Sequence, residues 1–198
     1  LTGTNVAVTD AGAVDLGAST VAGTLGITSA GAVTDSGTLA ITGATTISAS
    51  GQDITLDQAA STFGTLALTG ANVAVTENAA TDLGASTVSG TFAITSGGAI
   101  TDSGTQAITG DATFTNTAGT DDAITLDDAS NAFGGTVTFA TDSGSAVTIV
   151  DTTALDLKAL TAASLSATSG GAVTDSGTLA IAGATTISAS GQDITLDQ

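Results

Sequence analysis

Cysteine, histidine, methionine, tryptophan, tyrosine and proline are all absent from this sequence of 198 residues. Without cysteine and histidine the chain can form neither a disulfide bond nor a metal site with thiolate or imidazole ligands. Lys158 is the only basic residue, against 19 acidic residues, and the formal net charge is −18. Because almost no positive charge is available to neutralise phosphates, we expect no nucleic-acid partner and no attraction to anionic membranes.

Long hydrophobic runs are also missing. No apolar stretch approaches the roughly 18 residues of a membrane-spanning helix, and no signal peptide is visible, so we expect no membrane insertion. Hydrophobic residues make up 41% of the chain but aromatic residues only 3%, and 26 glycines accompany many threonines and serines. Helical spacing of apolar residues is scarce, whereas β-branched residues separated by glycine favour short strands joined by tight turns. The composition therefore predicts an all-β protein.

The sequence repeats itself. Residues 31–58 return at 171–198 with a single change, from Thr42 to Ala182, and a weaker copy runs through 98–110 and 121–128. Aligning Leu1 with Leu68 gives an offset of 67 residues, and aligning Gly98 with Gly171 gives 73. Self-similarity at this scale is typical of solenoids and repeat arrays. We expect super-repeats near 1–64, 65–135 and 136–198.

A shorter rhythm lies inside each super-repeat. Alternation of large apolar residues with Thr, Ala or Asp places the apolar side chains on one face of a strand. It occurs at 6–9, 39–42, 54–57, 66–69, 92–95, 124–127 and 137–139. Two or three such strands, broken by Gly, Ser, Asn and Asp, would make one coil in segments bounded at 1–23, 24–43, 44–64, 65–90, 91–110, 111–135, 136–162, 163–183 and 184–198.

These patterns predict a parallel β-helix, or β-solenoid, of about nine coils of 20–27 residues that runs as one continuous unit through 1–198. Coils stacked at the strand spacing of roughly 4.8 Å would give a rod on the order of 43 Å long. We expect the five phenylalanines (Phe63, Phe92, Phe114, Phe133 and Phe139) to fill wider parts of the core. An immunoglobulin-like sandwich array ranks well below the solenoid, because its units usually have about 100 residues and a larger aromatic core.

Units such as GAVTDSGTLAITGATTISASGQDITLD, followed by STFG or NAFG and TVTF, resemble the repeats of large bacterial surface exoproteins. These are the filamentous-haemagglutinin-like and autotransporter-type β-helix adhesins. The resemblance covers essentially the whole chain and is one of repeat style. It implies a right-handed β-helix, export to the extracellular surface, and a role as a stalk, adhesin or biofilm matrix fibre.

The motif Asp-Ser-Gly resembles the catalytic loop of aspartic proteases, which need two carboxylates that share a proton. It occurs in register at Asp35, Asp102 and Asp175, and out of register at Asp142. Repetition at the coil period favours a turn, in which Asp or Ser bonds its own backbone and Gly supplies a positive φ. We therefore assign no catalytic residue.

Acidic pairs are a second candidate for chemistry. Asp121-Asp122, Asp127-Asp128, and Asp53 with Asp57 could offer oxygen ligands to Ca²⁺. Neither the glycine-rich nonapeptide of calcium β-rolls nor an EF-hand loop is present, so we assign no metal ligand and expect no cofactor, with weak Ca²⁺ binding left as an alternative.

Other activities of β-helix proteins find little support. Lys158 is the only candidate base for a polysaccharide lyase, and paired carboxylates for a hydrolase would lack aromatic sugar platforms. We therefore expect no enzyme. Thr-x-Thr at 113–117 and 136–138 could order water on a flat face, but unequal coil lengths are expected to break a regular threonine lattice.

The expected function is that of a structural or adhesive segment in a secreted surface filament or adhesin stalk. Leu1 matches Leu68 and Gln198 matches Gln58, which predicts a segment of a longer repeat protein. Exposed strand edges at both ends predict either further coils or a second copy docked end to end. The expected partners are therefore the chain itself and cell-surface glycans. The alternative is an extracellular module that binds carbohydrate or Ca²⁺.

Overall fold

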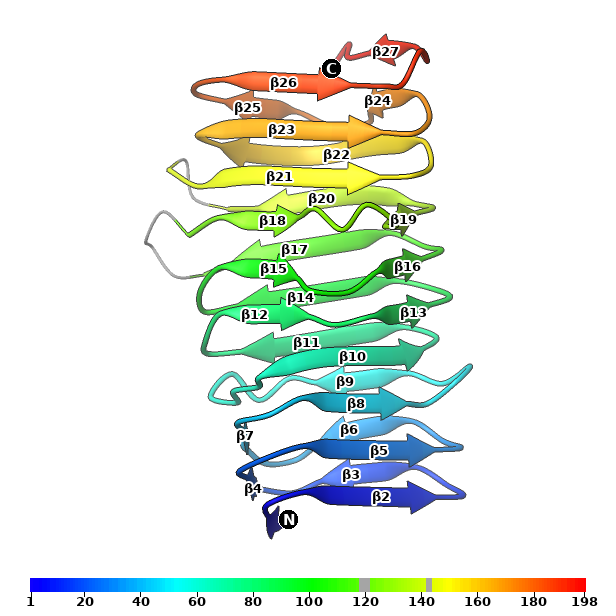
Figure 1. Ribbon diagram of the computed structural model, residues 1–198, viewed down its shortest axis with the longest axis vertical. Helices are drawn as coiled ribbons and strands as arrows, with labels where there is room; N and C mark the ends of the chain where they lie inside the picture. The colour runs from blue at the N-terminus through cyan, green and yellow to red at the C-terminus, as the bar shows by residue number, and fades with distance from the viewer. Residues whose placement is uncertain (118–121, 142–143) are drawn as a thin grey trace.

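The computed structural model describes residues 1–117, 122–141 and 144–198. In it the chain winds into a parallel β-solenoid of about nine turns, and the two termini lie at opposite ends of an elongated body (Figure 1). Front strands run from left to right and back strands from right to left as the chain rises, so the winding is right-handed. The predicted fold class is confirmed.

The front of the rod in Figure 1 is a sheet of 13 strands that pair in parallel. They are β2 (Val6–Asp10), β5 (Leu25–Ser29), β8 (Thr45–Ser48), β10 (Thr65–Gly70), β12 (Thr81–Leu83), β13 (Ser86–Val88), β15 (Ile100–Asp102), β16 (Gln106–Ile108), β18 (Ile124–Leu126), β19 (Ala132–Phe133), β21 (Ala146–Asp151), β23 (Ser164–Ser169) and β26 (Thr185–Ser188).

The back of the rod is a parallel sheet of 11 strands. They are β3 (Val14–Leu16), β6 (Val33–Asp35), β9 (Ile54–Leu56), β11 (Val73–Glu77), β14 (Phe92–Ser96), β17 (Ala112–Asn116), β20 (Thr136–Ala140), β22 (Leu155–Ala162), β24 (Val173–Asp175), β25 (Leu179–Ile181) and β27 (Ile194–Thr195). A three-stranded sheet of β1 (Thr2–Gly3), β4 (Ser19–Val21) and β7 (Leu39–Ile41) adds a third face near the N-terminus.

Strand alternation builds the core as the sequence predicts. In β14, Phe92 and Ile94 are buried while Ala93 and Thr95 face outward. Each inward residue stacks on the in-register residue of the next coil, so that Ile94 lies over Phe114. Apolar ladders of this kind run through the described part of the rod, and each coil covers the apolar face of its neighbour.

All five phenylalanines are buried, which confirms their expected place in the core. Four of them form one cluster around Phe114, whose ring centroid lies 5.9 Å from Phe92, 6.1 Å from Phe133 and 5.8 Å from Phe139. Two of these contacts are edge-to-face and one is stacked. The cluster joins the two large sheets in the middle of the rod.

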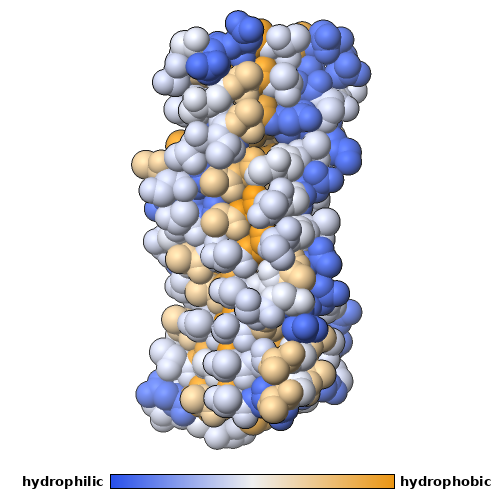
Figure 2. Space-filling view, turned by 90° about the vertical axis from the view of Figure 1, so that its right-hand side faces the viewer, coloured by the Kyte–Doolittle hydropathy of each residue, from blue (hydrophilic) through white to orange (hydrophobic). Residues whose placement is uncertain are grey.

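The rod seen from its right-hand edge carries side chains in columns along the long axis, with hydrophilic residues gathered on one side (Figure 2). Among the residues that the structure describes, none forms a helix with the length and apolar character that a membrane crossing requires.

Equivalent strands of successive super-repeats lie on opposite sheets. Val6 aligns through three register steps with Leu25, Thr45 and Leu66 on the front sheet. Its repeat equivalent, Val73, follows half a turn later on the back sheet. One super-repeat therefore spans three and a half coils, so each copy is rotated by half a turn about the rod axis relative to the one before it.

The half-turn rotation explains how the nearly identical segments 31–58 and 171–198 are placed. Their strands β6 and β24 both lie on the back sheet, and β8 and β26 both lie on the front. The corresponding strands of the middle super-repeat, β15 and β17, occupy the reverse sheets. Copies separated by two super-repeats therefore share the same local environment.

The glycine of the Asp-Ser-Gly motif has a different role from the predicted one. Positive φ occurs among the described glycines only at Gly51 and Gly191, so the turn conformation does not require Gly37. Instead, a Cβ at Gly37 would lie 2.3 Å from the backbone nitrogen of Ala18 in the coil below. The motif needs glycine because two turns stack in close contact.

We predict that Gly37→Ala destabilises the rod by about 1–3 kcal/mol, because the added methyl group would push two stacked turns apart. Gly17→Ala is the matched control, since a Cβ there meets nothing within 4 Å, and it should change stability by less than about 0.5 kcal/mol. Urea unfolding midpoints provide the comparison. Equal midpoints for the two variants would contradict the close-contact explanation.

Candidate functional site

Polar side chains inside the rod connect successive coils, and the same contacts recur in each super-repeat. A buried serine ends the strand that precedes each Ser-x-Gly turn. Its hydroxyl donates to a carbonyl of the coil below and accepts the amide of the glycine two residues later. The donated bonds are Ser29 to Gly12 (2.7 Å), Ser96 to Ala79 (2.8 Å) and Ser169 to Thr153 (2.7 Å).

The Asp-Ser-Gly aspartates bind the coil above them. Their carboxylates accept backbone amides from the turn that follows the next strand: Asp57 to Asp35 (2.9 Å), Asp127 to Asp102 (2.8 Å) and Asp197 to Asp175 (2.8 Å). The prediction of a turn role is therefore correct, but the expected bond to the motif's own backbone is replaced by a bond between coils. Asp142 lies outside the described residues.

Residues 57–64 and 127–134, which we call the junction segments, are held by side chains from two directions. Ser61 and Asn131 are buried within them, and each accepts a backbone amide of the coil below, from Leu39 (3.0 Å) and Gln106 (2.7 Å). Asn131 also donates to Asp102 at 2.6 Å. These side chains satisfy buried backbone groups that no strand partner reaches.

Acidic residues hold the junction segments from the following coil. Glu77 accepts the amide of Phe63 at 3.1 Å, and Asp151 accepts that of Phe133 at 3.2 Å. Glu77 is only 3% exposed and Asp151 only 1%. Sequence reasoning missed both, although the alternation Val73-Val75-Glu77 places Glu77 on the inward face and could have revealed it.

Burial changes the protonation of these acids. Desolvation by burial raises the pKa of Glu77 to about 7, although the Phe63 amide bond works in the opposite direction. The same cause raises the pKa of Asp151 and of Asp35, against the amide bonds that each accepts. One oxygen of each carboxylate is buried without a hydrogen-bond partner of standard geometry. These three sites favour the neutral carboxyl.

The remaining aspartates named from the sequence stabilise turns. Asp53 accepts two bonds from Asn72, at 3.1 Å from the backbone amide and 3.0 Å from the side chain. Asp128 accepts the Thr105 hydroxyl at 3.0 Å. In 1–117, 122–141 and 144–198 no group of three or more acidic side chains converges in a way that could hold a metal ion. Asp121 lies outside these ranges.

Lys158 lies exposed on β22, on the outward side of the back sheet. The exposed Asp111 has a lowered pKa, first because the backbone amide of Thr136 donates to it at 2.9 Å and also because Lys158 contributes an attractive charge. Lys158 therefore acts on a surface turn.

Outward threonines form columns more regular than expected. Thr76, Thr95 and Thr115 are in register on the back sheet, and the column continues with Ala140. The expectation that unequal coil lengths would disrupt the register is wrong for this sheet, because the extra residues lie in turns. Alanine nevertheless interrupts the threonine lattice.

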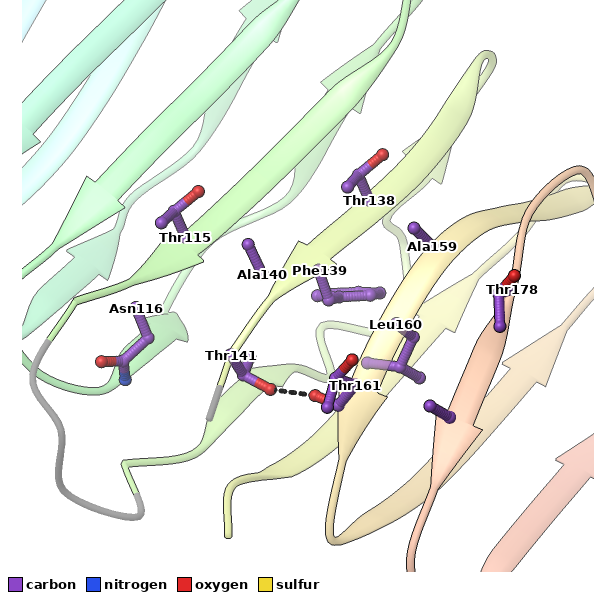
Figure 3. Close-up of a pocket in the computed structure, with 11 residues that line it drawn as sticks. Thr115, Asn116, Thr138, Phe139, Ala140, Thr141, Ala159, Leu160, Thr161 and Thr178 are labelled. Carbon is purple, nitrogen blue, oxygen red and sulfur yellow. Dashed lines mark hydrogen bonds between the residues drawn. The ribbon is translucent and has the colours of Figure 1, made fainter. Parts of the chain in front are cut away.

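A groove of about 570 Å³ opens over the C-terminal half of the back sheet (Figure 3). It lies where the register between β20 and β22 shifts at Val137/Thr138. Phe139 and Leu160 form its floor, outward threonines and alanines line its sides, and Thr141 donates a hydrogen bond to the Thr161 carbonyl. None of its lining residues carries a carboxylate, amine or imidazole, so the groove offers apolar and hydroxyl contacts.

The chain matches a protein family described as repeats of unknown function (DUF5649) at residues 3–69, 70–140 and 144–198. These matches cover nearly the whole sequence, and the chain therefore belongs to this family. Searches of curated proteins and of solved structures gave no match.

We predict that Asp102→Ala destabilises the rod by about 2–3 kcal/mol, because it leaves buried donors of a junction segment without an acceptor. Asp175→Ala is the matched control: it removes the same motif residue, but its partners Asp197 and Gln198 are exposed at the end of the chain. We expect that change to cost less than about 0.5 kcal/mol. Comparable losses in urea unfolding midpoint would mean that Asp102 does not secure the junction segment.

Stability should also depend on pH through Glu77. The folded state holds the Glu77 proton up to about pH 7, whereas the model value is 4.5. The folded state thus binds more protons between these values, so stability is greatest below the unfolded pKa and falls as pH rises through the folded pKa. The shift corresponds to a loss on the order of 3 kcal/mol.

Glu77→Gln should remove this part of the slope, because the amide retains an acceptor for Phe63 and carries no titrating proton. Asp10→Asn, at the exposed equivalent position of the first super-repeat, is the control and should leave the slope unchanged. The measurement is the unfolding midpoint from pH 4 to 8. An unaltered slope in Glu77→Gln would contradict the assignment.

Proposed function

We propose that this chain is a structural segment of a secreted bacterial surface filament or adhesin stalk, whose task is to provide length and stiffness. The observation that supports this role is the threefold recurrence of contacts between coils. Ser29, Ser96 and Ser169 make the same bond in each super-repeat, and so do Asp35, Asp102 and Asp175. Such side chains specify stacking, and a catalytic site has no need of three copies.

The charge of the chain fits an extracellular rod. A net charge of −18 favours solubility and keeps neighbouring rods apart laterally. It also disfavours nucleic acid and anionic lipid as partners, which leaves neutral surfaces such as cell-surface glycans as the proposed contacts. The outward threonine and alanine columns would present hydroxyl and methyl groups to such a surface.

A second candidate is an extracellular module that binds carbohydrate or Ca²⁺. The groove over Phe139 and Leu160 favours the carbohydrate version, because it combines an apolar floor with hydroxyl groups. The turn aspartates favour weak ion binding. Calorimetry separates the candidates: a melting temperature that rises with Ca²⁺ and falls with chelator supports the ion-binding module, and an unchanged value supports the rod.

We expect antibodies raised against the purified chain to label intact cells that produce it. Immunogold electron microscopy of cells that have not been permeabilised provides the measurement, with an antibody to a cytoplasmic protein as the control. Gold particles displaced from the outer membrane along thin fibres are the expected result. Labelling that appears only after permeabilisation would contradict the proposed location.

A further inference from the structure

The large hydrophobic side chains that are exposed in the described structure all lie at the two ends of the rod. Leu1 is 45% exposed, Ile194 47% and Leu196 42%. Their internal equivalents, Leu68, Ile54 and Leu56, are each 0% exposed.

The three buried equivalents all lie at one interior interface. There β9 pairs with β11, so that Ile54 lies beside Val73 and Leu56 beside Val75. In the same interface β8 pairs with β10, which places Leu68 beside Ile47. Each exposed apolar residue at an end therefore has a counterpart that this interface covers.

Both halves of that interface are present at the ends of the chain. Residues 185–198 are identical to residues 45–58, which form its lower side. Residues 1–10 repeat 68–77, which form much of its upper side, with changes only at Thr4 and Asp10. The ends thus carry a complementary pair of surfaces that the chain already joins once internally.

We propose that the C-terminal end of the rod binds the N-terminal end of a second copy of this chain, in the register of the interior interface. Ile187 then lies beside Leu1 of the second copy, and Ile194–Leu196 beside its Val6–Val8. The polar contact between Asp53 and Asn72 would recur between Asp193 and Asn5 of the second copy.

The register sets the rotation between copies. β27 belongs to the back sheet and β2 to the front sheet, and the proposed contact pairs these two strands. The second copy is therefore turned by half a revolution about the rod axis. A filament built in this way repeats along its axis once for every two copies.

One part of the interior interface has no equivalent at the ends. Residues 59–67 separate Gln58 from Leu68, and at the C-terminus their place is an open slot of about 310 Å³ that includes Leu179, Ile181 and Leu196. In the interior, Phe63 and Leu66 fill the corresponding space. Joining two copies leaves this slot unfilled, so the contact is weaker than an interior coil boundary.

Analytical ultracentrifugation of the full chain, in buffer with enough salt to screen its charge, tests the proposal. We expect dimers and longer oligomers that increase with concentration. Ile194→Asp should weaken the association by about tenfold or more, because it places a charge among apolar side chains. Thr87→Asp adds the same charge to an exposed position on a lateral face and should leave the association unchanged.

Three results would overturn the proposal. The chain could remain monomeric at every concentration, Thr87→Asp could weaken association as much as Ile194→Asp, or electron micrographs could show side-by-side packing. Circular dichroism and unfolding midpoints verify that both variants stay folded.

A second variant tests the register itself. Appending residues 59–67 after Gln198 supplies the strand that the slot lacks, and it should tighten the association at least about tenfold. An appended segment with Asp in place of the equivalent of Phe63 is the control and should give no such gain. Equal effects of the two extensions would contradict the assigned register.

The inference rests on the structural role proposed above, but the two can fail separately. Surface labelling of producing cells together with a monomeric chain would reject end-to-end binding alone. Labelling confined to the cell interior would reject the extracellular role, whatever the chain does in the centrifuge.

Discussion

Parallel pairing between one coil and the next is the interaction on which the whole structure depends. No coil has a hydrophobic core of its own, since its inward face is a single layer of side chains that only the adjacent coils can cover. Ile94 beside Phe114 is one example, and the same relation recurs along the rod. Stability is therefore shared between neighbours, and a coil without a neighbour exposes apolar groups, as Leu1 and Ile194 do.

Polar side chains determine how the coils stack. Apolar ladders alone would tolerate slippage between strands, because neighbouring inward positions carry similar side chains. Serine and aspartate contacts such as Ser96 with Ala79 and Asp102 with Asp127 connect defined positions of adjacent coils. The junction segments add a second constraint, because Asn131 and Asp151 bind one of them from opposite directions. The buried carboxyl groups remain neutral more readily than exposed ones, and this reduces the desolvation cost of placing them there.

Much of the fold could be predicted from the sequence, because alternation within a strand and repetition between strands are local properties. The positions of β2, β9 and β14 and the burial of the phenylalanines followed from such patterns. The placement of equivalent strands on opposite sheets did not, because it depends on how many residues close each coil. The role of Glu77 was hidden because an acidic residue beside a turn is usually exposed. The partner of Asp35 belongs to the next coil, and the motif alone carries no record of it.

The absence of cysteine makes a direct test of the coil register simple, because two cysteines can be introduced without competition. Thr95 and Thr115 are outward neighbours on adjacent coils of the back sheet, although they are far apart in sequence. Parallel neighbours lie within the Cα separation that a disulfide spans. The account predicts that Thr95→Cys with Thr115→Cys forms an intramolecular disulfide under mild oxidation. It also predicts that Thr28→Cys with Thr95→Cys, which pairs repeat equivalents on opposite sheets, does not. Cross-linking of the second pair and not of the first would contradict the stacking of coils and the half-turn between super-repeats.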